Sequence, residues 1–370
     1  MRVLYNSFAG QYSDSPRSIY ERLTAREDRI SHLWIADPAR AAAFPPHVRT
    51  VPVGTEACRR ALESADVVVS NTHIELDWQK SPSTLYLQTW HGTPLKHIHY
   101  DVLWAPPGRL DYLTQDVRRW DHLLSPNTVS TPRLRGAFGF TGPVLESGYP
   151  RNDVLSAPDR DAVRSRVRRE LGIGDEKTVV LYTPTWREDL VDANGAQDFR
   201  LHLDLDQLTR RLGPDHVILL RLHYMVSGRL GPCDIPGVQD VSFHQDVSEL
   251  YLAADAMVTD YSSTMFDFAV TGKPMVFYTY DLEHYRGTLR GFYFDFEQAA
   301  PGPIVDSTSA VADALADLDR LERSYADRYA DFRSAFCHLD DGGATQRVLD
   351  RFFPVEDPGH TMFDVSAVEV

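Results

Sequence analysis

The sequence predicts an α/β fold made of two parallel-sheet domains, and three observations lead to this prediction. Short apolar runs alternate with helical patterns along the chain, as in proteins whose parallel strands are joined by helices. The alternation forms two blocks, and turn-forming residues gather between them at Gly148, Pro150, Asn152 and Pro158. The chain has 370 residues, which is enough for two domains of ordinary size.

Each block supplies its own strands and helices. In the first block we expect a helix over residues 17–26, with Ser15 as its N-cap and Pro16 at its first position. The other elements expected there are strands at 2–5, 30–35, 48–53, 66–70, 84–89, 121–125 and 144–146, and helices at 55–64 and 131–138. In the second block we expect strands at 178–182, 216–222, 256–259 and 274–278, helices at 160–171, 206–212, 247–254 and 264–271, and an almost wholly helical segment at 310–353.

Composition excludes several classes of protein. The formal net charge is −15, whereas a general nucleic-acid binder needs a basic surface that neutralises phosphates. The chain has three cysteines, which are Cys58, Cys233 and Cys337. They lie far apart and lack metal-ligand spacing, as is typical of free thiols in a reducing compartment. The N-terminus lacks the layout of a signal peptide, and no apolar stretch approaches the length of about 18 residues that spans a membrane. We therefore expect a cytoplasmic protein, and peripheral contact with the inner face of the cell membrane stays open.

Open parallel sheets bind ligands at the carboxyl ends of their strands, so polar residues at those points are candidates for chemistry. His91 and Gly92 follow the expected strand at 84–89, and Lys96 lies shortly behind them. Because an unperturbed histidine has a pKa of about 6.5, His91 can accept a proton at neutral pH, and Lys96 can stabilise negative charge. The alternative is a histidine that only hydrogen bonds to a loop carbonyl.

Two strand ends of the second block also carry polar residues. Arg221 and His223 stand two residues apart, on one side of the strand at 216–222, and suit a pyrophosphate. The alternative is an ion pair with an acidic neighbour. Asp260, Ser262 and Ser263 follow the strand at 256–259, where hydroxyls and the start of a helix suit a phosphate. Ordinary helix capping by one of these serines explains the same residues.

Two further segments are weaker candidates. Thr185 and Arg187 follow the strand at 178–182 and fit contact with a phosphate or a base. Arg151 and Asn152 lie in the turn between the two blocks, which is equally typical of a plain interdomain connection.

Known cofactor motifs give little support for other chemistry. Asp204-Leu205-Asp206 resembles a metal signature, but its place before a helix indicates an N-terminal cap, so we predict no metal site. The motifs of simple dinucleotide-binding, P-loop, zinc-protease and α/β-hydrolase proteins are absent from the sequence.

Taken together, these segments resemble the CDP-glycerol glycerophosphotransferase family, which contains teichoic acid primases and polymerases and related capsule polymerases. The resemblance runs from about residue 65 to residue 353. It rests on Trp90–Lys96 (WHGTPLK), Gly148–Asp153 (GYPRND), Tyr182–Arg187 (YTPTWR), Arg221–His223 (RLH), Thr259–Ser263 (TDYSS), Phe266–Phe268 (FDF), Lys273–Pro274 (KP), Tyr280–Glu283 (YDLE), Arg290–Phe296 (RGFYFDF) and Asp341–Ala344 (DGGA).

The resemblance implies a GT-B-like fold, in which two Rossmann-like domains face a cleft and C-terminal helices return to the first domain. The implied divisions are an acceptor-side domain at 1–152, a CDP-donor-binding domain at 153–335, a helix packed back on the first domain at 336–355, and a disordered tail at 356–370.

The resemblance also implies residue roles. His91 is expected to be the general base for the acceptor hydroxyl, and His223, as a cation, to hold the donor phosphates. The other donor-side residues are expected to be Asp260, Ser262, Ser263, Arg221, Thr185 and Arg187. Residues that support the acceptor side are expected to be Gly92, Thr93, Lys96, Arg151 and Asn152.

The implied reaction moves glycerol phosphate, or a related polyol phosphate, from CDP-glycerol or another CDP-polyol to an acceptor hydroxyl and releases CMP. We expect no tightly bound cofactor or metal and no nucleic-acid partner. The acceptor stays open among a polyol-phosphate polymer, a lipid-linked molecule and a small molecule, as does addition of one unit or many. A glycosyltransferase that uses a nucleotide sugar and a non-catalytic nucleotide-binding module are the alternatives.

Overall fold

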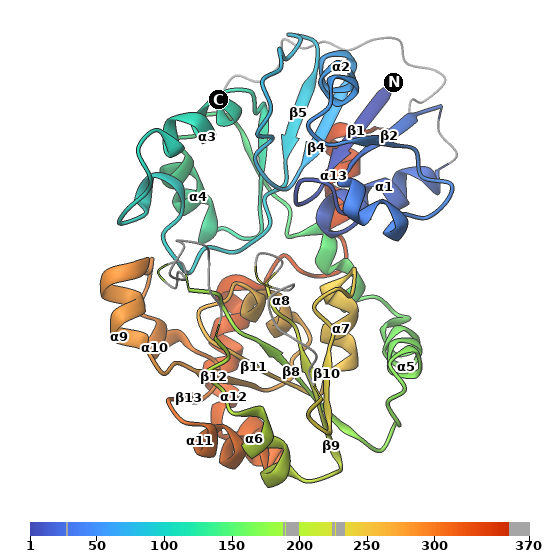
Figure 1. The fold of residues 1–370 in the computed structure, drawn as a ribbon. Coiled ribbons are helices and arrows are strands. Elements are labelled where there is room, and N and C mark those ends of the chain that lie inside the picture. Colours follow the sequence, from blue (N-terminus) through green and yellow to red (C-terminus); the bar gives the residue numbers. More distant parts are fainter. Residues whose placement is uncertain (27–28, 188, 190–199, 224–225, 227–233, 355–370) are drawn as a thin grey trace.

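The computed structural model describes residues 1–26, 29–187, 189, 200–223, 226 and 234–354. Within this part of the chain, two sheets lie one above the other in Figure 1, each with helices on its faces. The upper sheet has the strand order β3-β2-β1-β4-β5-β6-β7, and its strands pair in parallel. Its strands are β1 (Arg2–Asn6), β2 (Ser31–Ala36), β3 (Thr50–Pro52), β4 (Val67–Ser70), β5 (Leu85–Gln88), β6 (His122–Ser125) and β7 (Val144–Glu146).

The lower sheet repeats this arrangement with the order β10-β9-β8-β11-β12-β13, again with parallel pairing. Its strands are β8 (Thr178–Thr183), β9 (His216–Leu220), β10 (Val238–Asp240), β11 (Ala256–Thr259), β12 (Met275–Tyr278) and β13 (Ile304–Val305). In each sheet the order in which successive strands are added changes direction once. The change lies between β1 and β4 in the upper sheet and between β8 and β11 in the lower sheet. Ligands of such sheets bind at this reversal, beyond the carboxyl ends of the strands.

The helices pack on the two sheets. In the upper half they are α1 (Asp14–Thr24), η1 (Pro38–Ala43), α2 (Glu56–Ser64), η2 (His99–Asp101), α3 (Arg109–Val117) and α4 (Ser130–Phe138). The chain then crosses through η3 (Pro150–Leu155) into α5 (Arg160–Glu170), α6 (Leu205–Leu212), α7 (Val247–Ala253), α8 (Thr264–Val270), α9 (Leu282–His284), η4 (Tyr285–Leu289), α10 (Phe296–Ala299), α11 (Thr308–Leu315) and α12 (Leu318–Phe336).

The last helix, α13 (Ala344–Phe352), returns to the upper half, where Figure 1 shows it in red beside α1. Val348, Leu349 and Phe353 are buried in the same apolar cluster as Val3 and Tyr5 of β1. The connection at η3 fixes this return, because the Asp153 carboxylate accepts hydrogen bonds from the amides of Ala344 at 2.9 Å and Thr345 at 2.8 Å. These bonds cap the first turn of α13, where helix amides have no partner of their own.

Most of the predicted elements are confirmed to within a few residues, and β7 and β11 match to the residue. Apolar runs such as Val67–Ser70 are buried on both faces, as expected for central parallel strands. Asp204 caps α6 as predicted, since its carboxylate accepts from the Gln207 amide at 2.9 Å.

Other predictions of secondary structure were wrong or incomplete. The first helix begins at Asp14 and has Ser13 in the N-cap position, so Ser15 lies inside the helix. Two short strands, β10 and β13, and the helix α3 were not predicted. The expected division at 152/153 falls within η3, and the domain limits stay a proposal. The expected disordered tail lies outside the described residues.

Candidate functional site

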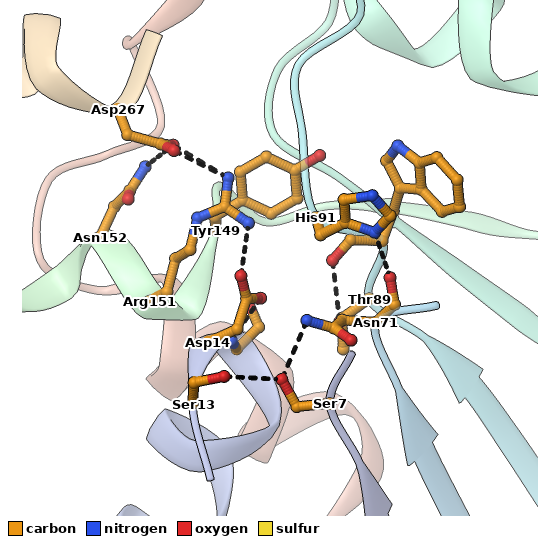
Figure 2. Close-up of polar contacts among 12 residues, drawn as sticks. Ser7, Ser13, Asp14, Asn71, Thr89, His91, Tyr149, Arg151, Asn152 and Asp267 are labelled. Atoms are coloured by element: carbon orange, nitrogen blue, oxygen red, sulfur yellow. Dashed lines mark hydrogen bonds and ion pairs between the residues drawn. The ribbon is translucent and has the colours of Figure 1, made fainter. Parts of the chain in front are cut away.

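His91 follows β5, and its ring is oriented by the backbone of the neighbouring strand end. The Nδ1 atom lies 2.5 Å from the carbonyl oxygen of Asn71, which follows β4 (Figure 2). Because a carbonyl can only accept a hydrogen bond, Nδ1 carries the hydrogen of the neutral ring. The other nitrogen, Nε2, is therefore left as a proton acceptor, which is the state that a general base needs.

Asn71 is itself fixed to the segment that follows β1. Its side-chain oxygen accepts from the Phe8 amide at 2.9 Å, and its side-chain nitrogen donates to the Ser7 hydroxyl at 3.1 Å. The Ser7 hydroxyl lies 3.0 Å from that of Ser13, at the start of α1. The ends of β1, β4 and β5 are thus joined around the reversal point of the upper sheet, and His91 is held there.

The environment of His91 keeps its ring neutral. Burial lowers its pKa below the usual 6.5, and the Asn71 carbonyl and the Asp14 carboxylate only partly oppose this effect. The turn before it is strained, because Trp90 has a φ of 53°, in the left-handed region that aromatic residues rarely adopt. Such strain is found mainly at functional sites, where packing maintains it.

Arg151 and Asn152, predicted as supporting residues, connect the two halves of the molecule. The Arg151 guanidinium lies 3.1 Å from the Asp14 carboxylate of the upper half and 3.0 Å from that of Asp267 in α8 (Figure 2). The Asn152 side-chain nitrogen donates to Asp267 at 2.9 Å. The Arg151 and Asp267 side chains are only 5% and 7% exposed. Each charge is therefore stabilised by the opposite charge of its partner and not by solvent.

The segment after His91 reaches across to the lower half. A Cβ added at Gly92 would lie 2.9 Å from the Ser263 hydroxyl, so any larger residue would require that side chain to shift. Thr93 is buried. Lys96 pairs with Phe292 in an antiparallel bridge, and its ammonium lies 6.0 Å from the ring of Tyr285. Lys96, predicted on the acceptor side, is therefore placed against the lower half, which was predicted to bind the donor.

The lower reversal point carries Thr185, Arg187 and Asp260. The Asp260 carboxylate accepts from the Thr185 amide at 3.0 Å and lies 3.0 Å from the Arg187 guanidinium. Arg187 also binds Asp281, at 2.7 Å. Burial disfavours charge on Arg187, but Asp260, Asp281 and Tyr280 together outweigh it and raise the arginine's pKa above its usual value. The two carboxylates thus hold Arg187 in place behind the turn.

The two serines of this turn lie at the start of α8. Ser263 occupies the N-cap position, yet its side chain makes no capping hydrogen bond. The Ser262 hydroxyl accepts a long bond from the Thr264 amide, at 3.4 Å. One of the two serines was expected to cap the helix; Ser262 makes this one long bond and Ser263 makes none, and what distinguishes Ser263 is its place opposite Gly92.

Arg221 and His223 follow β9 and are both largely buried. The Arg221 guanidinium donates to the carbonyls of Val241 at 3.1 Å and His244 at 2.7 Å. Burial, together with charge repulsion from Lys96, His91 and Arg221, lowers the pKa of His223 to about 3. The expectation of a cationic His223 is therefore wrong for the protein without donor. The ring of His223 lies parallel to that of Trp186, with centroids 5.9 Å apart.

Sequence reasoning missed Asn71, Asp14 and Asp281, which position His91, Arg151 and Arg187. Asn71 follows a buried strand, so the criterion that found His91 could have found it too. Asp281 lies within the YDLE segment of the resemblance. No sequence pattern pointed to Asp14 as a site residue, because its partner Arg151 is 137 residues away in the chain.

Two features are absent from the part of the chain that the structure describes. No cluster of histidine, cysteine and carboxylate side chains suited to a metal ion occurs in that part of the chain. None of its helices combines the length and apolar character needed to cross a bilayer.

Comparisons with known proteins agree with this geometry. A sequence model of the family described as CDP-glycerol:poly(glycerophosphate) glycerophosphotransferase matches residues 1–354. The teichoic acid glycerol-phosphate transferase of Staphylococcus aureus is 40% identical, over 95% of this chain and 92% of its own. The teichoic acid poly(glycerol phosphate) polymerase of Bacillus subtilis is 37% identical, over 96% of this chain, which spans about half of that relative (49%).

A solved structure shows the same fold. That of the wall teichoic acid polymerase TagF superposes with a TM-score of 0.86 and 36% identity, over 95% of this chain and 88% of that one. A histidine-to-asparagine variant of TagF was also solved after a soak with CDP-glycerol. The two doubly wound sheets are thus those of a GT-B-like fold, as predicted. By its sequence over nearly its whole length and by its structure, the chain belongs to the CDP-glycerol:poly(glycerophosphate) glycerophosphotransferase family.

Proposed function

We propose that the protein transfers glycerol phosphate from CDP-glycerol to an acceptor hydroxyl in the synthesis of a teichoic acid-like polymer. The observation that carries this proposal is the orientation of His91, whose Nε2 is left as a proton acceptor by the bond from Nδ1 to Asn71. His91 lies in the upper half, and the adjacent Gly92 faces Ser263 of the lower half so closely that an added Cβ would lie 2.9 Å from its hydroxyl. A base from one half thereby meets a phosphate-binding turn of the other.

The proposed reaction is a displacement at phosphorus. Nε2 of His91 takes the proton of the acceptor hydroxyl, whose oxygen forms a bond to the phosphorus that carries glycerol. The bond from this phosphorus to the bridging oxygen breaks, and the oxygen leaves with CMP. Phosphoryl transfer depends mainly on positioning and on stabilisation of charge, and a positioned base contributes about 10²–10⁴ in rate.

The lower half is proposed to bind the donor. Ser262, Ser263 and Lys96 would contact the pyrophosphate, with His223 beside them as a neutral hydrogen-bond donor. Arg187 and Asp260 hold one another within hydrogen-bond distance, so their role would be to fix the turn that carries Thr185. Arg221 would act in the same indirect way, through the carbonyls that it binds.

The proposal is tested by CMP release from CDP-glycerol with a panel of acceptors. We expect release that depends on acceptor and is abolished in His91→Ala. A thermal-shift panel of nucleotides is the companion measurement. If UDP- or GDP-sugars stabilise the protein more than CDP-glycerol does, the nucleotide-sugar alternative replaces this proposal.

A further inference from the structure

A cavity of about 450 Å³ lies beyond the carboxyl ends of the upper sheet, and His91 forms part of its wall. This volume falls within the range of small-molecule sites. The walls come from the reversal point of the sheet, where Asn6 ends β1, Phe8 lies just beyond it and Thr72 follows β4, and from α3, which contributes Leu113. The cavity is separate from the turn that carries Asp260.

Most of the cavity wall is apolar. Ile35, Cys58, Ile74, Trp90 and Leu113 line it, and several of them also belong to the core cluster on this side of the sheet. Such a wall makes favourable contact with the carbon skeleton of a ligand. It cannot solvate an ionised group.

The charged groups among the lining residues are already paired. Arg109 and Glu75 form a two-pronged ion pair, with distances of 2.6 and 2.7 Å, and both side chains are about two-fifths exposed (43% and 44%). They therefore lie at the rim, in contact with solvent. A phosphate bound in the cavity would need a cationic side chain that is not already paired with a carboxylate.

The remaining polar groups are neutral. Burial, together with charge repulsion from His99, His91 and Arg109, lowers the pKa of His73 to about 3. Its Nδ1 is buried and has no hydrogen-bond partner, although the Asp116 carboxylate is 3.8 Å away. Thr72 and Asn6 lie nearby, 3.3 Å apart. A neutral imidazole offers one donor and one acceptor, and this pairing suits hydroxyl groups.

We propose that this cavity receives the uncharged polyol end of the acceptor, while the phosphates of the acceptor remain outside it. The proposal rests on the proposed function, because it takes His91 as the base that meets the acceptor hydroxyl. It adds that acceptors are selected by a neutral, hydroxyl-bearing terminus that fits an apolar cavity. His73 is then a residue that determines acceptor specificity.

The first test fills the cavity. Leu113→Trp should raise the KM for acceptor at least tenfold and leave the dissociation constant of CDP-glycerol, measured by calorimetry, within twofold of wild type. Leu103→Trp is the matched control, because Leu103 is 52% exposed and is not a lining residue. Val53→Trp fills the cavity from a partly exposed position, 37% exposed, and covers the case in which Leu113→Trp does not fold. An unchanged acceptor KM in a folded filling variant would overturn the proposal.

The second test concerns charge. Two short glycerol phosphate fragments, identical except that one ends in free glycerol and the other in a phosphomonoester, compete with the full acceptor. We expect the glycerol-ended fragment to compete at least tenfold better, and to lose this advantage in His73→Phe. Equal or stronger competition by the phosphate-ended fragment contradicts the proposal. Failure of the proposed function is a different result, namely no CMP release by the wild-type protein with any acceptor.

Discussion

The reversal points of the two sheets occupy equivalent places in the fold but differ in their chemistry. At the upper one, His91 is neutral and opens on an apolar cavity. At the lower one, Arg187 is held between two carboxylates, and Arg221 behind it is held by two carbonyls. The same backbone frame thus supports a neutral site, where we propose a proton transfer, and a charged site beside the turn that we propose binds phosphate.

This difference shows that charged residues at strand ends also bind groups of the protein itself. Arg187 and Arg221 were predicted to contact the donor. The structure places their guanidinium groups on protein acceptors, and contact with the donor stays a prediction. The neutral residue, His91, is the one whose proton-accepting atom is left for chemistry.

The largest effect is expected from removing the base. His91→Ala should lower kcat by about 10²–10⁴, because the acceptor hydroxyl loses its proton acceptor, while CDP-glycerol binding stays within a few fold. CMP release and calorimetry measure the two quantities. His47→Ala is the control, since His47 is exposed and far along the chain from the motif. If His91→Ala weakens donor binding as much as it lowers turnover, the proposed separation of a proton-transfer site from a donor-binding site is wrong.

The next largest effect is expected at the charged site. Arg187→Ala leaves the buried Asp260 and the partly buried Asp281 without their shared cation, and such a loss costs about 3–5 kcal/mol of the free energy of unfolding. Urea unfolding measures it. Arg210→Ala should cost at most about 0.5 kcal/mol, because Arg210 is 70% exposed and pairs only within α6. Equal costs for the two variants would show that Arg187 is not structural.

The pH dependence tests the neutrality of the upper site. Burial lowers the pKa of His91, so its ring remains a proton acceptor at more acidic pH than an exposed histidine does. The acid limb of kcat/KM should therefore have its midpoint below 6.5, with a flat profile from neutral pH upward. A midpoint above 7 would mean that a carboxylate such as Asp14 dominates the environment of the base.

The smallest effect is expected where the two sites meet. Gly92→Ala places a Cβ 2.9 Å from the Ser263 hydroxyl, which can move by rotation, so kcat should fall less than tenfold. Gly136→Ala is the matched control, because nothing lies within 4 Å of its added Cβ, and it should leave kcat unchanged. A loss as large as that of His91→Ala would indicate that the halves must approach more closely during reaction.

Much of the fold could be predicted, because strands such as Val67–Ser70 and Ala256–Thr259 are apolar on both faces and lie between clear turns. The strands β10 and β13 have three and two residues, too few to show any periodicity. At the candidate site, the position of His91 followed from its strand end. The orientation of its ring could not be predicted, because it depends on a backbone carbonyl 20 residues earlier in the chain. Every residue has such a carbonyl, so the residue type at that position carries no information about the bond. The charge of His223 could not be predicted either, because it depends on how deeply the folded protein buries the ring, and a position at the end of a strand does not determine this.

The return of α13 has a consequence for how the protein is made. About 200 residues lie between β7 and α13, and at a translation rate of about 5–20 residues per second this stretch takes roughly 10–40 s to synthesise. During that time the nascent upper domain lacks Val348 and Leu349, so its apolar surface around Tyr5 is exposed to other chains and to chaperones. The half that contains His91 is begun first on the ribosome and is completed last.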